Sequence, residues 1–191
     1  MLILASQSPR RREMFDRLGV SYQAISTDAD ETVTETLTPD AYVITLAKRK
    51  ADAARSEEKD TVVAADTVVA LENEIFGKPE DREDAIRMIT ALSGRTHKVY
   101  TAFAIRHDGK VYAEAVATEV TFRPLTEKEI AYYVDREQPY DKAGAYAIQE
   151  MAGIFVEALS GNFDNVVGLP LCQLELALKR EFGISLFDFV E

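Results

Sequence analysis

The chain has 191 residues, 47% of them hydrophobic and 29% charged, and its formal net charge is −11. This size and composition predict a single globular domain over residues 1–191, with a sizeable core and room for two lobes. Because the chain has no basic surplus, no apolar run of ~20 residues and no signal-peptide pattern, we expect a soluble cytoplasmic protein that binds neither polymeric nucleic acid nor membrane.

The first element is an apolar strand over 2–5 that leads directly into a cationic helix. Ser8 is a suitable N-cap, Pro9 suits the first helical position, and Gly19 ends the helix. The N–H groups of the first turn and the guanidinium groups beside them favour a bound anion such as phosphate. A capped surface helix with solvated arginines is the equally weighted alternative. The candidate anion site comprises Ser6, Ser8, Arg10 and Arg11.

A second helix carries a lysine on its apolar side. A short strand over 22–25 and an acidic loop over 28–32 precede this helix, which starts at Thr38. Lys50 lies four residues after Leu46 on the apolar stripe, so it leaves the helix from the packed side. The alternative is a lysine that extends along the apolar surface to water.

A carboxylate interrupts the most apolar segment of the chain. Residues 61–71 are rich in β-branched residues and predict a buried strand, with Asp66 in its middle. Burying a carboxylate is unfavourable unless a cation or several donors hold it. We therefore expect a positive partner for Asp66; exposure at an edge strand or a bulge is the alternative. Residues 72–74 form the turn of a predicted hairpin that leads into residues 75–79. There Lys78, between a glycine and a proline, is either a site cation or a solvated lysine.

The remaining elements alternate between helices and strands. We expect a helix over 81–92, and strands over 99–106 and 110–122 around a turn at 107–109. A capping box at Thr126–Glu129 opens a helix through Val134. A loop over 140–149, a strand over 154–159 and a last helix that ends at Gly183 complete the chain. This order predicts an α/β fold with a mixed sheet.

Cysteine and histidine are too few for several common types of site. Cys172 is the only cysteine, which excludes an internal disulfide, and its apolar neighbours predict a small buried side chain. With only His97 and His107 present, a zinc site and a histidine-activated nucleophile are disfavoured. A divalent cation held by carboxylates and phosphate oxygens fits the acidic chain better.

The charged candidates suit phosphoryl or nucleotidyl transfer to water. A G-x-x-x-x-G-K-[ST] loop is absent, and so is a G-x-G-x-x-G sequence after the first strand, which disfavours P-loop enzymes and nicotinamide dehydrogenases. Cations, carboxylates and a metal can position a phosphate chain and neutralise its charge while a base activates water.

Six short motifs follow one another between residue 2 and about residue 175. They are Ser6-x-Ser8-Pro9-Arg10-Arg11, Ala65-Asp66-Thr67-Val68-Val69, Gly77-Lys78-Pro79, residues 93–101, residues 140–149 and residues 165–170. Together and in this order, the motifs resemble the Maf family of septum-formation-inhibitor-like nucleoside triphosphate pyrophosphatases. The resemblance implies an α/β fold similar to inosine triphosphate pyrophosphatases, with a mixed, elongated, twisted sheet flanked by helices in two lobes with a cleft. It also implies metal-dependent hydrolysis, with Mg²⁺ or Mn²⁺, of a nucleoside triphosphate to the monophosphate and pyrophosphate.

Site roles follow from the resemblance at the matching positions. Asp66 corresponds to the general base that activates water, and the metal ligands correspond to Glu31, Asp66 and Asp141. Arginine, threonine and glutamine at three further positions are typical of the dTTP/UTP branch, and a glutamine amide can pair with a thymine or uracil edge. These three are Arg11, Thr67 and Gln149. The triphosphate-binding residues correspond to Ser6, Ser8, Arg10, Lys50, Lys78 and Lys142.

Two other functions use most of the same residues. A nucleotide-binding protein linked to cell division and septum formation would need the phosphate site, but it would not need a carboxylate inside an apolar strand. A nucleotidyltransferase would pass the nucleotidyl group to an alcohol instead of water. In either case the partner is a small nucleoside triphosphate. The sequence is compatible with a homodimer and with a monomer.

Overall fold

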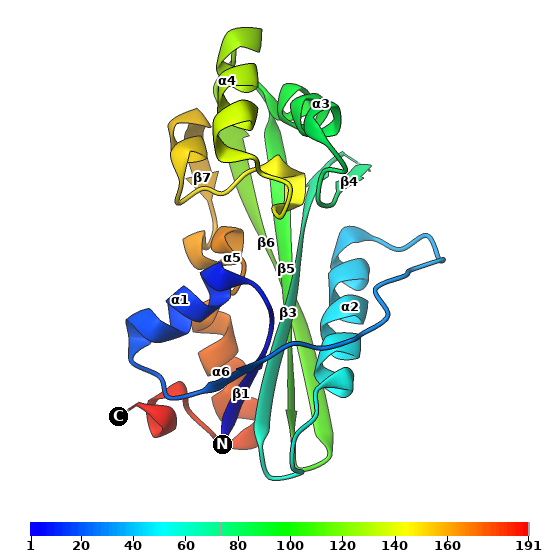
Figure 1. Ribbon diagram of the computed structural model, residues 1–191. Coiled ribbons are helices and arrows are strands. Elements are labelled where there is room, and N and C mark those ends of the chain that lie inside the picture. Colours follow the sequence, from blue (N-terminus) through cyan, green and yellow to red (C-terminus); the bar gives the residue numbers. More distant parts are fainter. Residues whose placement is uncertain (73, 191) are drawn as a thin grey trace. The chain divides into compact units, whose positions relative to one another are not determined.

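The computed structural model describes residues 1–72 and 74–190 as a mixed α/β chain. The sheet order is β2-β1-β3-β5-β6-β7, with β4 beside β3, and the helices flank this sheet as predicted (Figure 1). The strands are β1 (Leu2–Ala5), β2 (Gln23–Ile25), β3 (Thr61–Leu71), β4 (Glu74–Phe76), β5 (Thr96–His107), β6 (Lys110–Phe122) and β7 (Val156–Ser160). The helices are α1 (Pro9–Leu18), α2 (Pro39–Ala53), α3 (Arg82–Leu92), α4 (Glu127–Glu137), α5 (Phe163–Val167) and α6 (Leu171–Phe182), with short 3-10 helices η1 (Ala143–Ala145), η2 (Met151–Phe155) and η3 (Leu186–Phe189).

The chain folds as two compact units. The first unit comprises Met1–Asp66, Thr101–Val116 and Gly168–Glu191, and the second comprises Thr67–Tyr100 and Ala117–Val167. Strands β3, β5 and β6 therefore each contribute residues to both units. One domain over the whole chain remains a prediction.

The first unit is built on a short, fully buried parallel strand. β1 pairs in parallel with β2 and with β3, and Leu2 lies opposite Thr61. Every residue of β1 is at most 2% exposed. A parallel strand covered on both faces must be apolar throughout, which is the pattern of this segment. The buried pairing fixes the end of β1, and with it the turn that carries the serines.

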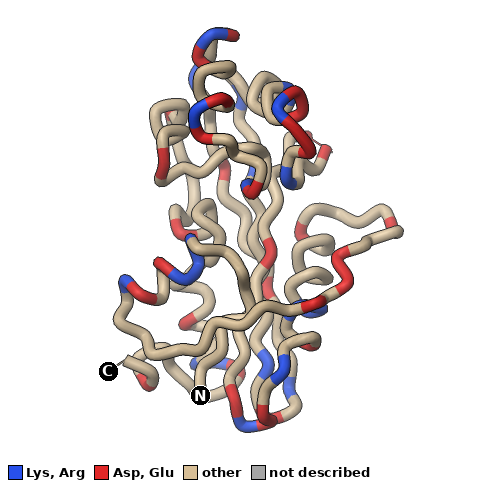
Figure 2. Tube along the Cα trace, in the orientation of Figure 1, with Lys and Arg blue, Asp and Glu red and all other residues tan. Residues whose placement is uncertain are grey.

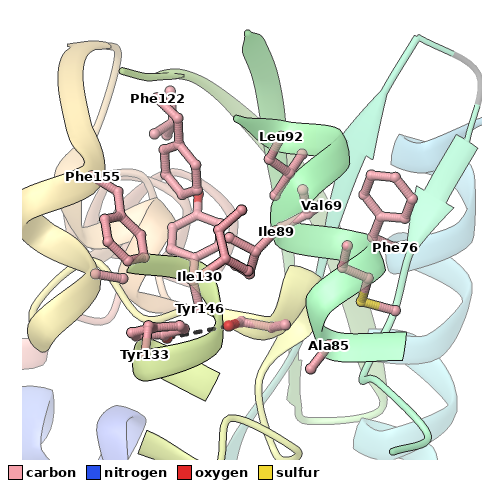
Figure 3. Packing of buried hydrophobic residues seen from close by; sticks show 14 of the residues in the cluster. Val69, Phe76, Ala85, Ile89, Leu92, Phe122, Ile130, Tyr133, Tyr146 and Phe155 are labelled. Atoms are coloured by element: carbon pink, nitrogen blue, oxygen red, sulfur yellow. Dashed lines mark hydrogen bonds between the residues drawn. The ribbon is translucent and has the colours of Figure 1, made fainter. Parts of the chain in front are cut away.

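The second unit has an aromatic core. β4 pairs antiparallel with β3, and β7 pairs antiparallel with β6. Helices α3 and α4 lie side by side and bury their apolar faces in this unit (Figure 1). Phe122, Tyr133, Tyr146 and Phe155 pack edge to face within the core, with ring centroids 4.9–5.9 Å apart (Figure 3). Such pairs add specific geometry to the hydrophobic burial.

Most predicted elements are confirmed with small shifts at their ends. The buried strand occupies 61–71 as predicted, and α4 continues three residues beyond Val134. The predicted strand over 154–159 begins instead at Val156, because η2 precedes it. Helix α5 was not predicted, since its five residues are too few for a periodic pattern. The predicted turn over 72–74 includes Asn73, which lies outside the described residues.

The prediction of a buried cysteine is wrong, because Cys172 is exposed. Helix α6 buries Leu171, Leu174 and Leu178, which are spaced three and four residues apart on one face. Cys172 lies off this stripe, so its apolar sequence neighbours did not reveal its exposure. Over the described ranges, no helix combines the length and apolarity that a membrane span needs.

Candidate functional site

The turn between β1 and α1 brings hydroxyl, amide and guanidinium groups together around Ser6. Ser6 is 8% exposed, and its Oγ accepts hydrogen bonds from the Ser8 N–H and from Arg11 Nη1, both at 3.2 Å. Ser8 occupies the N-cap position as predicted, but its side chain makes no capping hydrogen bond. The first turn of α1 holds no acidic residue, and three arginines follow Pro9 there (Figure 2). The positive end of the helix dipole and these cations together favour an anion.

Arg11 connects this turn to a second segment of the same unit. Its Nε donates to the Gly168 carbonyl oxygen at 2.7 Å, while Nη1 donates to Ser6. Loss of water around the guanidinium lowers the pKa of Arg11 to about 10, although the negative charge of Asp66 acts in the opposite direction. The group therefore stays positive at neutral pH. Sequence reasoning did not identify Gly168 as its partner, because a backbone carbonyl leaves no side-chain signal.

A lysine ammonium group connects the buried carboxylate to the acidic loop. Lys50 Nζ lies 2.6 Å from Asp66 Oδ1 and 3.1 Å from Glu31 Oε2. The Asp66 side chain is 12% exposed, the Lys50 side chain 15% and the Glu31 side chain 59%. Asp66 is therefore paired with a half-buried cation, as expected, rather than exposed at an edge or a bulge. Lys50 points to this carboxylate rather than to water. Such pairing is what allows a carboxylate to remain inside a protein.

The two carboxylates beside Lys50 fit a hard divalent cation. Asp66 and Glu31 already converge on one positive group, and their oxygens are the ligand type that Mg²⁺ and Mn²⁺ prefer. Mg²⁺ commonly takes only one or two carboxylates and completes its shell with water and phosphate oxygens. Over residues 1–72 and 74–190, no group of three or more His, Cys, Asp or Glu side chains could hold a metal alone. Asp141 belongs to the second unit.

The other predicted site residues belong to the second unit. Lys142 is 8% exposed, and its Nζ lies 3.0 Å from Asp141 Oδ1 and 3.4 Å from Glu150 Oε2. Glu150 was missed, although it directly follows a motif residue. Lys78 and Gln149 are exposed, and Thr67 is half-buried on β3. The structure brings Asp141 and Lys142 together.

Both histidines lie outside these clusters. His97 is 2% exposed, and its Nε2 lies 2.8 Å from the Tyr146 hydroxyl in the core of the second unit. Burial lowers the pKa of His97 from 6.5 to about 4, so the ring is neutral near pH 7. His107 Nδ1 lies 3.1 Å from Thr61 Oγ1 at the end of β5.

Known proteins are similar to this chain along most of its length. A family model described as Maf-like protein matches residues 1–181. A protein of Bacillus velezensis named dTTP/UTP pyrophosphatase is 45% identical over 185 residues, which are 96% of this chain and 97% of that protein. A protein of Anaeromyxobacter sp. (strain Fw109-5) with the same name is 47% identical over 184 residues, 94% of this chain and 88% of that protein. Among solved structures, a HAM1 protein from Coxiella burnetii is 16% identical, with a TM-score of 0.47 over 93% of this chain and 98% of that chain.

Proposed function

Because this chain belongs to the Maf-like protein family, we propose that it is a hydrolase that converts dTTP and UTP, and modified pyrimidine nucleotides, to the monophosphate and pyrophosphate. The observation that carries the proposal is the position of Asp66. Its buried carboxylate lies within an apolar strand, and the Lys50 Nζ lies 2.6 Å from its Oδ1. Binding alone would not need a carboxylate there. The names of the relatives in Bacillus velezensis and Anaeromyxobacter support dTTP and UTP as substrates.

The triphosphate is the part of the substrate that the first unit is suited to bind. The first-turn amides of α1, the Ser6 hydroxyl and the charged groups of Arg10 and Arg11 supply donors of the kind that phosphate oxygens accept. Lys50 adds a further positive charge beside Asp66. Lys78 and Lys142 are proposed to bind the same triphosphate, on the basis of the family resemblance.

The reaction is a displacement by water at the α-phosphorus. Asp66 accepts a proton from the water molecule while the water oxygen forms a bond to that phosphorus. The bond from the α-phosphorus to the bridging oxygen breaks, and pyrophosphate leaves with the bonding electrons. Such reactions depend mainly on positioning and on charge stabilisation.

A divalent cation is proposed as the cofactor. Glu31 and Asp66 would hold Mg²⁺ or Mn²⁺, and the resemblance adds Asp141. Bound there, the ion would neutralise charge on the phosphate oxygens. Base preference is assigned to Arg11, Thr67 and Gln149 on the same resemblance, and the proposed partner is a free cytoplasmic nucleotide.

The test is product analysis with purified protein and each nucleotide, in Mg²⁺ or Mn²⁺. We expect one pyrophosphate for each monophosphate formed, and no activity after chelation until metal is restored. Asp66→Asn should lower kcat by ~10²–10⁴, the usual contribution of a positioned base. Asp52→Asn, which makes the same change at an exposed position of α2, should retain activity.

Four outcomes would contradict the proposal in different ways. Release of orthophosphate and a diphosphate would exclude attack at the α-phosphorus. Binding of dTTP without any monophosphate would favour the nucleotide-binding alternative. Products of transfer to added alcohols would favour a nucleotidyltransferase. Unchanged activity of Asp66→Asn would remove this residue from its role as the base.

A further inference from the structure

The segment that carries Asp141, Lys142 and Gln149 has an unusual backbone. Gly144 has φ +65° and ψ 15°, and the next residue, Ala145, has φ +60°. This left-handed region is unfavourable for residues with a Cβ, so Ala145 is strained. Two consecutive residues in this conformation persist only where the surroundings hold them. The contacts of Gly144 show what holds the segment.

Gly144 lies directly against strand β3. A Cβ at this position would be 2.6 Å from Val69 Cγ2 and 2.9 Å from Val69 Cβ. Val69 is 2% exposed and belongs to the aromatic core (Figure 3), so it has little room to move. Only a residue without a side chain permits this approach.

The same residue contacts a second predicted phosphate-binding segment. The Gly144 N–H donates to the Gly77 carbonyl oxygen at 2.9 Å. Gly77 directly precedes Lys78, and Gly144 follows Lys142 by two residues. Both lysines are therefore attached to backbone that meets at Gly144.

The segment cannot easily withdraw from β3 to make room for a side chain. The Tyr133 hydroxyl donates to the Ala145 carbonyl oxygen at 3.2 Å. The Tyr146 hydroxyl lies 2.8 Å from His97 Nε2, and its ring packs edge to face on Phe122. These buried contacts follow Gly144 directly in the chain, so a shift of the segment would break them.

We propose that Gly144 is a positioning residue that fixes the Lys142 segment and the Lys78 loop relative to each other and to β3. Its missing side chain permits the contact with Val69, and that contact aligns its N–H with Gly77. The role of the two lysines in triphosphate binding rests on the proposed function. The junction itself, which is the contact of Gly144 with Val69 and with Gly77, does not.

The first test compares two glycines with similar backbones. Gly94 has φ +69°, but a Cβ there meets nothing closer than 3.7 Å. Gly144→Ala and Gly94→Ala therefore introduce similar backbone strain, and only Gly144→Ala adds a steric clash. We expect Gly144→Ala to lower kcat/KM for dTTP by ~10²-fold, mainly through a higher KM, because small displacements of positioning groups have effects of this size. Gly94→Ala should keep the kinetics of the parent protein.

A rescue variant tests whether the clash is the cause. Val69→Ala removes the Cγ2 atom that makes the 2.6 Å contact, although the Cβ contact at 2.9 Å remains. The double variant Gly144→Ala, Val69→Ala should therefore recover part of the lost kcat/KM. A double variant no better than Gly144→Ala, at equal folded fraction, would overturn the steric explanation.

Amide hydrogen exchange tests the junction without any substrate. In Gly144→Ala, but not in Gly94→Ala, exchange should accelerate in peptides covering 77–80 and 141–149. Unchanged exchange at 77–80 would overturn the proposed link. If the parent protein releases no pyrophosphate, the proposed function is wrong. The hydrogen-exchange measurement still tests the junction in that case, because it needs no substrate. If Gly144→Ala does not fold, Tyr146→Phe loosens the same segment through the loss of its bond to His97, and it should accelerate exchange at 141–149.

Discussion

Individual buried polar residues in this protein are accommodated in two opposite ways. The Asp66 carboxylate lies 2.6 Å from the Lys50 ammonium group, whereas burial keeps His97 neutral beside the Tyr146 hydroxyl. The Asp66–Lys50 pair belongs to the proposed phosphate site. The neutral histidine instead supports packing, and it makes folding sensitive to pH.

Acid should destabilise the protein through His97. The unfolded residue binds a proton near pH 6.5, but the folded residue does so only near pH 4, so a falling pH favours the unfolded state across this interval. The contribution of the neutral ring is complete above pH 6.5 and is lost towards pH 4. His97→Gln should flatten the dependence of the unfolding free energy on pH by up to ~1.4 kcal/mol per pH unit. Urea titrations between pH 4 and 7 measure this slope. Parallel curves for the parent and His97→Gln would contradict the prediction.

The sequence predicted single residues well where they break a pattern. Asp66 was found because it interrupts an eleven-residue strand that is otherwise apolar or β-branched. The bond between Lys50 and Asp66 could not be predicted, because it joins a helix and a strand through tertiary packing. Cys172 was misplaced because sequence neighbours do not determine which face of a helix a residue occupies. Gly144 gave no local sign of its contact with Val69, which is distant in the chain.

At the scale of elements, helices α2 and α4 both have a threonine at the N-cap, but only the threonine of α4 caps its helix through the side chain. Thr126 and Glu129 form a complete capping box at α4. Hydrogen bonds from Arg123 and from the Thr126 backbone lower the pKa of Glu129 from 4.5 to about 2, so the box stays charged at ordinary pH. At α2, the Thr38 side chain makes no capping hydrogen bond.

This difference predicts different costs for the same substitution. Thr126→Ala should lower the unfolding free energy by ~1 kcal/mol, because the Glu129 N–H loses its acceptor. Thr38→Ala should have a smaller effect, since no helix N–H depends on that hydroxyl. Urea denaturation of both variants provides the comparison. Equal losses would show that the box adds nothing specific to α4.

The types of the longer helices and strands could be predicted from local sequence, whereas the short irregular elements could not. The Ser-Pro and Thr-Pro starts of α1 and α2 were visible because proline sets the first helical φ. The 3-10 helix η2 displaced the start of β7 because three to five residues carry no usable periodicity.

At the scale of the whole molecule, the two compact units are connected by shared strands. β3, β5 and β6 each pass from one unit to the other. Neither unit is a continuous stretch of chain, which argues for one cooperative unfolding transition rather than two. The order of strands in the sheet was not predicted, because pairing between β1 and β3 joins segments that are far apart in sequence.

Fluorescence can test this cooperativity because the chain has no tryptophan. Tyr22→Trp places a probe at a half-buried position of the first unit, and Tyr100→Trp does so in the second. Both probes should report the same urea midpoint, which should also match that of circular dichroism for each variant. Two separated midpoints within one variant would show that the units unfold independently.

The division of the first unit along the chain also affects biosynthesis. β1 is translated well before Gly168–Glu191, which belongs to the same unit. An apolar strand therefore leaves the ribosome long before its unit can be completed. Exposed strands of this kind are prone to aggregation in nascent chains. We expect the emerging β1 segment to be a natural client for chaperones that hold hydrophobic segments until Gly168–Glu191 has been synthesised.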